Sequence, residues 1–196
     1  MKKHVRAQAG TTLLEVMVSV VVLAIGLLGV ASLQVNSLKY QKTANQRIEA
    51  TQAAYDIAER MRANWVFTTA NSGTAVSADA LYIADRKLNE DKYQLVATYA
   101  ANLAAADSAV PNDCTVVTGC DTNKIAKNDL QDWLRKLKQK LINGTGIISG
   151  VVGATSSSFD VTVMWQEQGF DAKDSTCPVA TSAPAGIRCF TVRVTV

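Results

Sequence analysis

The sequence has a single histidine, His4, and it lies within the first ten residues. Serine–histidine catalysis, cysteine–histidine catalysis and histidine zinc sites all need an imidazole. A mature chain that lacks the first ten residues could therefore have none of them. A Gly-rich phosphate loop, a nucleophile elbow and a carboxylate cluster are also missing. We therefore expect no catalytic residue, no metal and no cofactor, and a protein that is not an enzyme.

Positive charge is scarce once the N-terminus is set aside. Lys2, Lys3 and Arg6 all precede Gly10, and without them the 20 basic residues fall to 17, which equals the number of acidic residues. A nucleic-acid-binding body would need its positive charge on the folded part. The basic balance belongs to a short N-terminal tag, and no nucleic-acid partner is expected.

Charge is absent from the apolar run that follows the tag. Val16 to Leu33 is 18 residues without an ionisable side chain, which is enough for a membrane-spanning helix. Glu15 lies at the front edge of the run, although a carboxylate well inside a bilayer costs about 2.5–3.5 kcal/mol. The basic tag should stay cytoplasmic and send the C-terminal body across the membrane. No Ala-x-Ala cleavage site follows the run, so we expect the span to be retained.

Proline and glycine are missing between Gln34 and Ala63, a stretch rich in good helix formers. Residues 11 to about 64 are therefore predicted to form one helix, about 80 Å long. Its first half is apolar nearly all round, and its second half is weakly amphipathic and suited to packing on a globular head. The expected stripe on that half consists of Ala44, Ile48, Tyr55 and Ala58, with Met61 at its edge.

A second helix is predicted over residues 128–141, with Asn128 capping its start and Asn143-Gly144 ending it. One face carries Leu130, Trp133, Leu134, Leu137 and Leu141. The basic residues Arg135, Lys136, Lys138 and Lys140 invite a DNA-binding interpretation. We favour a solvated face whose cations lie near the C-terminal end of the helix, where they suit its dipole.

Three strands are predicted in the last third of the chain, over residues 147–152, 159–166 and 188–196. Apolar and polar residues alternate in the last two, which is typical of an antiparallel sheet with one buried face. Residues 93–99 alternate in a way that permits a strand, whereas the alanines around 100–106 favour a helix. The order of elements predicts an α+β fold.

All four cysteines, Cys114, Cys120, Cys177 and Cys189, lie in the second half of the chain. In an exported protein an even number indicates disulfides, and four cysteines allow three connectivities. We favour the local pairs, 114 with 120 and 177 with 189, each of which would contribute about 2–3 kcal/mol in the chain-entropy model. A metal site is disfavoured because neither spacing is Cys-x-x-Cys and the mature chain would have no histidine.

The residues Gly10-Thr11-Thr12-Leu13-Leu14-Glu15-Val16, followed by an apolar run, resemble the class III signal of type IV pilins and pseudopilins. The resemblance implies that prepilin peptidase cuts between Gly10 and Thr11 and that the new amino group of Thr11 is methylated. It also implies that Glu15 pairs with the N-terminal amine of a neighbouring subunit during assembly. An ammonium partner would offset the cost of a carboxylate in lipid.

The segment DIAERMRAN at residues 56–64 resembles a signature of the PilV family, minor pilins called type IV pilus modification proteins. The resemblance implies the pilin fold, a long N-terminal helix packed on an antiparallel sheet. Thr11 and Ser32 stand where major pilins usually have Phe and often have Pro, which counts against an abundant shaft subunit. The implied divisions are a leader (1–10), a membrane-spanning and filament-core half-helix (11–33), an amphipathic half-helix (34–65) and a globular α+β head (66–196).

The resemblance implies a minor pilin that takes part in pilus assembly, in a priming or tip complex, and in pilus-dependent adhesion or motility. Its partners would be prepilin peptidase, other minor pilins, the major pilin, inner-membrane lipid and, in some members, a tip adhesin. The chain would be a single-pass inner-membrane protein with its body in the periplasm, and later part of a surface pilus. The alternative is a pseudopilin of a type II secretion system, which shares the N-terminus.

Overall fold

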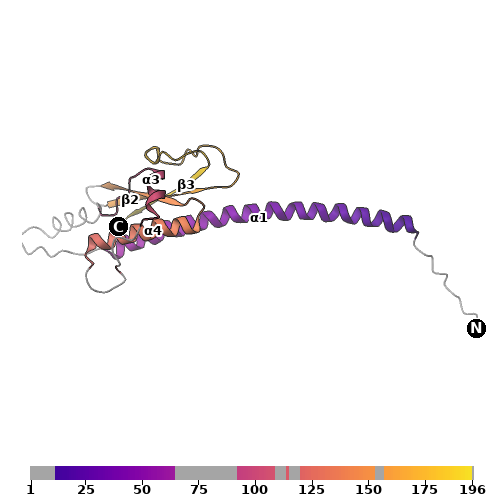
Figure 1. The fold of residues 1–196 in the computed structure, drawn as a ribbon, viewed down its shortest axis with the longest axis horizontal. Coiled ribbons are helices and arrows are strands. Elements are labelled where there is room, and N and C mark those ends of the chain that lie inside the picture. The colour runs from indigo at the N-terminus through magenta and orange to yellow at the C-terminus, as the bar shows by residue number, and fades with distance from the viewer. Residues whose placement is uncertain (1–11, 65–91, 109–113, 115–119, 153–156, 196) are drawn as a thin grey trace, which may run out of the picture. The chain divides into compact units, whose positions relative to one another are not determined.

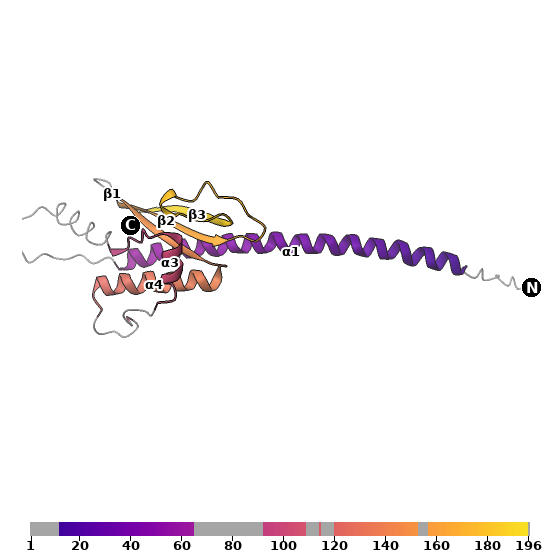
Figure 2. The same cartoon turned by 45° about the horizontal axis from the view of Figure 1, so that its top comes forward.

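The computed structural model describes residues 12–64, 92–108, 114, 120–152 and 157–195. The chain divides into two compact units, Met1–Ala44 and Asn45–Val196, and each is described by itself. The elements are α1 (Leu13–Ala63), α3 (Tyr99–Ala105), α4 (Thr122–Lys140), β1 (Thr145–Val152), β2 (Ser157–Gln166), the 3-10 helix η1 (Val179–Thr181) and β3 (Ile187–Thr195). Figure 1 labels most of the elements and Figure 2 adds β1.

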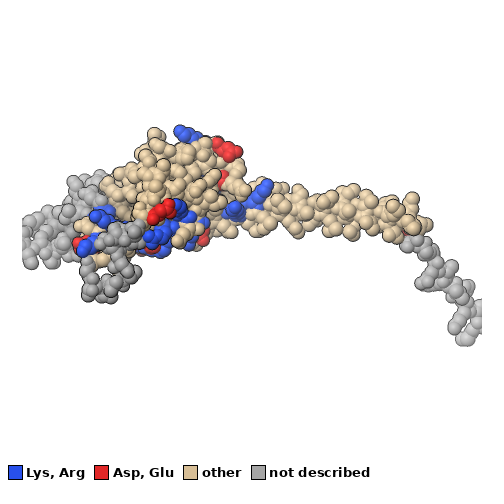
Figure 3. Space-filling view, in the orientation of Figure 1, with Lys and Arg blue, Asp and Glu red and all other residues tan. Residues whose placement is uncertain are grey.

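The first half of α1 is an apolar helix whose side chains are exposed. Its large apolar side chains between Leu13 and Leu38 are all more than half exposed, from 51% at Val16 to 79% at Leu13. Residues 16–38 carry no basic or acidic side chain, and Figure 3 shows this uncharged length of the helix. By length and composition, α1 is the one helix among the described residues that could cross a membrane. An apolar surface of this extent needs lipid or protein to cover it.

The second half of α1 buries a stripe of mainly small residues, and the predicted stripe was partly wrong. Ala58 and Met61 are buried as expected, but Ile48 and Tyr55 are 54% and 50% exposed. The reason is close packing, which small side chains permit and large ones prevent. Trp133 Nε1–H, for example, donates to the backbone oxygen of Ala53 at 2.9 Å. The buried residues are Gln46, Ala50, Ala54, Ile57, Ala58 and Met61.

Helix α4 begins six residues earlier than predicted. Asp121 is its N-cap and accepts from the backbone N–H of Lys124 at 2.8 Å, so Asn128 lies inside the helix. The predicted apolar face is confirmed for Trp133, Leu134 and Leu137, which are all buried. The helix ends at Lys140, and its C-cap Leu141 is extended. The left-handed residue Asn143, with a φ of 49°, follows in the turn between α4 and β1.

The three strands form one antiparallel sheet in the order β1-β2-β3, with Val161 of β2 opposite Ile148 and Val192. On one face, β2 packs against the second half of α1 and against α4, as Figure 2 shows. The main core includes Phe159, Val161, Val163 and Trp165, which alternate along β2 as predicted. The predicted α+β fold, a long helix packed on an antiparallel sheet, is thus confirmed.

The prediction of a single buried face was wrong. Met164 points to the opposite face and is fully buried. It belongs to a second apolar cluster with Tyr99 at the start of α3, Ile147 of β1, and Ala183 and Ile187 at the start of β3. The polar Thr162 beside it is also buried and shares a hydrogen bond of 2.8 Å with Thr191. The segment before β3 therefore completes a second core.

Residues 93–99, which the sequence left open between strand and helix, contain both. The backbone of Leu95 exchanges two hydrogen bonds of 2.9 and 3.0 Å with Ile148 of β1, as an isolated bridge. Helix α3 then starts at Tyr99 with Thr98 as its N-cap. Asn102 in this helix is buried and donates to the backbone oxygen of Gly146 at 3.0 Å. The segment thus fastens α3 to the edge of the sheet.

Candidate functional site

The start of α1 carries the residues that the resemblance singles out. The backbone N–H of Glu15 donates to the backbone oxygen of Thr12 at 3.0 Å and to its Oγ1 at 3.4 Å. Thr12 therefore caps the helix, and the Glu15 carboxylate lies in its first turn, where the helix dipole favours it. The Thr-x-x-Glu spacing is that of a capping box. Glu15 thus has a local role that the resemblance does not indicate.

Gly10 and Thr11, the predicted cleavage and methylation positions, lie outside the described residues, as does the rest of the leader. Glu15 is exposed, and it makes no ion pair with any residue in the described part of the chain. Its predicted partner is an amine on another subunit, so that role stays a prediction.

The signature segment at the end of α1 was expected to be a solvated helix end, and for Arg60 this was wrong. Its side chain is only 24% exposed, and its guanidinium lies 2.9 Å from Asp132 and 3.3 Å from Asp129 of α4. It also pairs with Asp56 one turn earlier, at 3.1 Å. Because a planar guanidinium offers several donors in fixed directions, one arginine serves three carboxylates and joins α1 to α4.

Two further residues of the segment bind the head through backbone oxygens. Asn64 Nδ2 donates to Thr122 at the start of α4 at 2.9 Å, and Arg62 Nη2 donates to Thr195 at the end of β3, also at 2.9 Å. Arg62 is also paired with Glu59. The polar residues of DIAERMRAN therefore fix the C-terminal end of α1 to two elements distant in sequence.

Burial and charge shift the ionisation of this network. Burial, together with the neighbouring Asp129 carboxylate, raises the pKa of the Tyr93 hydroxyl, which donates to Asp129 at 2.8 Å. Burial opposes ionisation of Asp132, but Lys136 and Arg60 outweigh it and hold the pKa of that carboxyl below its usual value. The Asp132 carboxylate is therefore ionised near neutral pH, whereas the Tyr93 hydroxyl keeps its proton.

The basic face of α4 is neutralised by local partners. Lys136 pairs with Asp132 at 2.9 Å, Lys138 with Asp107 at 2.5 Å, and Lys140 with Glu49 of α1 at 2.8 Å. Arg135 donates to the backbone oxygen of Ser108 at 3.3 Å. A helix that engages phosphates needs cations without such partners. This arrangement favours the interpretation of a solvated face over a DNA-binding one.

Both disulfides are the local pairs that the sequence analysis favours. The Cα atoms of Cys114 and Cys120 are 5.8 Å apart, and those of Cys177 and Cys189 are 5.1 Å apart. The first closes a short loop directly before α4. The second joins the irregular segment after β2 to the edge of β3.

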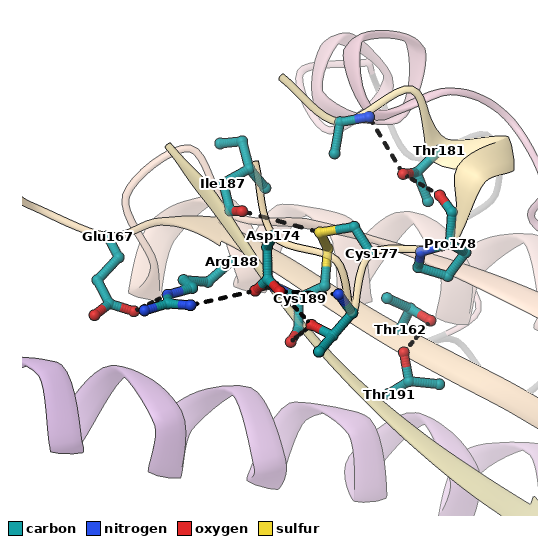
Figure 4. The surroundings of a disulfide bond; sticks show 12 residues. Thr162, Glu167, Asp174, Cys177, Pro178, Thr181, Ile187, Arg188, Cys189 and Thr191 are labelled. Atoms are coloured by element: carbon teal, nitrogen blue, oxygen red, sulfur yellow. Dashed lines mark hydrogen bonds and ion pairs between the residues drawn. A yellow bond between two sulfur atoms is a disulfide. The ribbon is translucent and has the colours of Figure 1, made fainter. Parts of the chain in front are cut away.

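An acid–base cluster surrounds the second disulfide (Figure 4). Asp174 accepts from the hydroxyl of Thr176 at 2.7 Å and from the backbone N–H of Cys189 at 3.2 Å. Burial opposes its ionisation, but these bonds and Arg188 prevail and lower the pKa of Asp174. Arg188 pairs with Glu167 at 2.9 Å and lies 3.6 Å from the ring centre of Phe170. The cluster holds the loop over the second core.

The charged groups of the head described above all have structural partners. The described residues contain no group of three histidine, cysteine or acidic side chains placed to hold a metal ion. A groove of about 480 Å³ runs between α1 and α4, with Ala53 and Leu137 on its apolar part and the Glu49–Lys140 pair at its edge. Its other charged residues are paired as well, Asp56 with Arg60 and Lys136 with Asp132.

Comparison with known proteins gives one match. The family model described as the prokaryotic N-terminal methylation motif matches residues 5–31. No curated protein and no solved structure matches the chain. The match includes Gly10, Thr11 and Glu15 together with most of the apolar run, and it supports a type IV pilin or pseudopilin. It implies processing by prepilin peptidase and assembly with other pilins, and it suits anchoring in the inner membrane.

Proposed function

We propose that this chain is a minor pilin of the PilV type and a structural component of a type IV pilus, not an enzyme. It is inserted in the inner membrane with its body in the periplasm, cut between Gly10 and Thr11, methylated, and then moved into the pilus. The observation that carries the proposal is the exposed apolar half of α1, most of which lies within the match to the methylation motif. Such a helix suits lipid first and the helices of other subunits later.

The choice of a PilV-type minor pilin over a type II pseudopilin is supported by residues 56–64. In this segment Asp56, Arg60 and Asn64 have partners on α4 or within α1. The segment that resembles the PilV signature thus has a structural role in this chain. That role and the two local disulfides support the PilV-type assignment.

The proposed partners follow from this assignment. Prepilin peptidase would process the leader, and other minor pilins and the major pilin would contact the chain in a priming or tip complex that serves adhesion or motility. Ile48 and Tyr55, which leave the core and face solvent on α1, offer an apolar contact surface for such subunits.

Mass spectrometry of the mature N-terminus tests the class of the protein. We expect the chain to begin with N-methylated Thr11. A chain that retains Met1, or one cut after residue 33, would remove the pilin proposal altogether.

Deletion of the gene separates the two pilin-like functions. A minor pilin predicts loss or strong reduction of surface pili with unchanged release of secreted proteins. The opposite result, normal pili with blocked secretion, would assign the chain to a type II secretion system.

A further inference from the structure

The residues directly after the apolar run carry positive charge and an aromatic ring. Lys39 and Lys42 are the first ionisable acidic or basic side chains after Glu15, and no acidic residue follows until Glu49. Tyr40 between them is 78% exposed. In Figure 3 basic side chains appear where the uncharged stretch of α1 ends. We call Lys39, Tyr40 and Lys42 the headgroup belt.

The length of helix between Glu15 and the headgroup belt matches a bilayer. The 24 residue steps from Glu15 to Lys39 correspond to about 36 Å of α-helix at ~1.5 Å per residue. The hydrocarbon core of a bilayer is about 30 Å thick, and about 40–45 Å with its headgroups. A tilt of about 20° shortens the projected length only to ~34 Å. Both ends therefore fall in headgroup layers, on opposite sides.

We propose that the headgroup belt binds the phosphates of anionic phospholipids and sets the depth of α1 in the membrane before assembly. Tyrosine is enriched at the membrane interface, and lysine ammonium groups extend to the phosphate level while their stems stay in the apolar layer. With the belt in one headgroup layer, the Glu15 carboxylate lies in the other one. This position removes most of the cost of a carboxylate in hydrocarbon without any protein partner.

Lipid fits the belt better than a protein surface does. At 100° per residue, the three side chains spread over about 160° of the helix circumference, which is wider than one helix–helix contact stripe. Lys39 makes no ion pair or hydrogen bond within the described part of the chain, so its charge is available to a phosphate. If the cut at Gly10 removes Lys2, Lys3 and Arg6, a step that rests on the proposed function, the belt also becomes the main cationic anchor of the mature chain.

The test measures depth in vesicles with the full chain. A nitroxide is attached at Ser37→Cys, with the native disulfides kept oxidised, and its depth is read by electron paramagnetic resonance from collisions with oxygen and a water-soluble nickel chelate. Vesicles of phosphatidylcholine with phosphatidylglycerol are compared with pure phosphatidylcholine. We expect the label to lie nearer the surface with the anionic lipid. The Lys39→Gln/Lys42→Gln variant should lie deeper by about one helical turn, ~5 Å.

A matched control carries Lys127→Gln/Lys173→Gln, which removes the same charge from exposed positions on the head, and should leave the label in place. A second label at Ser19→Cys should move toward the opposite surface when the belt is neutralised. Equal depths for the belt and control variants, or a depth that ignores the anionic lipid, would overturn the proposal. The measurement needs no pilus, so its failure leaves the proposed function standing.

Discussion

Arg60 shows how a single side chain can hold two helices together. Its guanidinium contacts Asp56, Asp129 and Asp132 within 3.3 Å. Burial works against the charge of Arg60, but the three carboxylates outweigh it and raise its pKa further. A lysine could offer only a point charge in place of this fork. Polar residues of segment 56–64 thus form contacts with α4, whereas an ordinary helix end would leave them in solvent.

The ionised carboxylates predict a loss of stability in acid. The pKa of Asp132 is held below its usual value by Lys136 and Arg60, and that of Asp160 by its hydrogen bonds with Arg193. A carboxyl group whose pKa is lower in the folded than in the unfolded protein stabilises the fold at any pH above its unfolded-state pKa, near 3.9. This stabilisation is lost as the pH falls through the folded-state pKa. Thermal unfolding of the full chain in detergent should therefore show a falling Tm below about pH 5.

The variant Asp132→Asn separates this network from other acid effects. It should cost about 0.5–1 kcal/mol at pH 7, as partly exposed ion pairs do, and flatten the acid limb of the Tm curve. Asp171→Asn, at an exposed carboxylate outside any ion pair of the described residues, serves as the control. An unchanged acid limb in Asp132→Asn would contradict the assignment.

At the scale of elements, the second half of α1 has small residues on the face that packs against the head. Ala50, Ala54 and Ala58, four residues apart, are all fully buried. Ala54→Leu adds bulk to this packed stripe and should destabilise the head by about 1–3 kcal/mol. That loss corresponds to a drop of several degrees in the Tm of the full chain, read by circular dichroism.

The neighbouring position provides the control for overpacking. Tyr55→Leu changes an apolar residue that is half exposed, and it should stay within about 0.5 kcal/mol of the wild type. If both variants lose stability equally, the face of α1 that packs on the head is not the alanine stripe.

How far the sequence predicts each element depends on the signal that element carries. Alternating β-branched and aromatic residues located the strands to within about two residues, because the period of two is a direct consequence of strand geometry. The stripe on α1 was misplaced because hydrophobicity favours Ile48 and Tyr55, whereas packing distance favours alanine. Asn128 and Asp121 are both acceptable N-caps, and the first turn of α4 has little apolar periodicity to choose between them.

The second core and the Arg60 junction needed tertiary information. Met164 and Thr162 alternate with core residues and read as the solvent face of β2. They are buried because the disulfide-closed segment and Tyr99 of α3 pack over this face of the sheet. In the same way, Asp129 and Asp132 look like surface residues of an amphipathic helix until α1 brings Arg60 beside them. Charged residues carry no sequence signal for a partner dozens of positions away.

At the scale of the whole molecule, the Glu15 carboxylate has a different role in the membrane than in an assembled filament. In the membrane, capping by Thr12 and a headgroup-level position are enough to tolerate the carboxylate. In a filament, the negative charge of Glu15 is needed for the proposed pairing with the N-terminal amine of another subunit. The capping box accepts either Glu or Gln, so Glu15→Gln keeps a side chain that can cap the helix and removes the charge, while Glu15→Ala removes both.

We expect both variants to insert in the membrane like the wild type and both to be depleted from pili by at least about tenfold. Removing one member of a buried ion pair costs roughly 3–5 kcal/mol, which is more than this factor requires. The measurement is an immunoblot of sheared pili against the membrane fraction. If Glu15→Gln enters pili normally while Glu15→Ala does not, the side chain at this position serves to cap the helix, and the charge-pairing role is wrong.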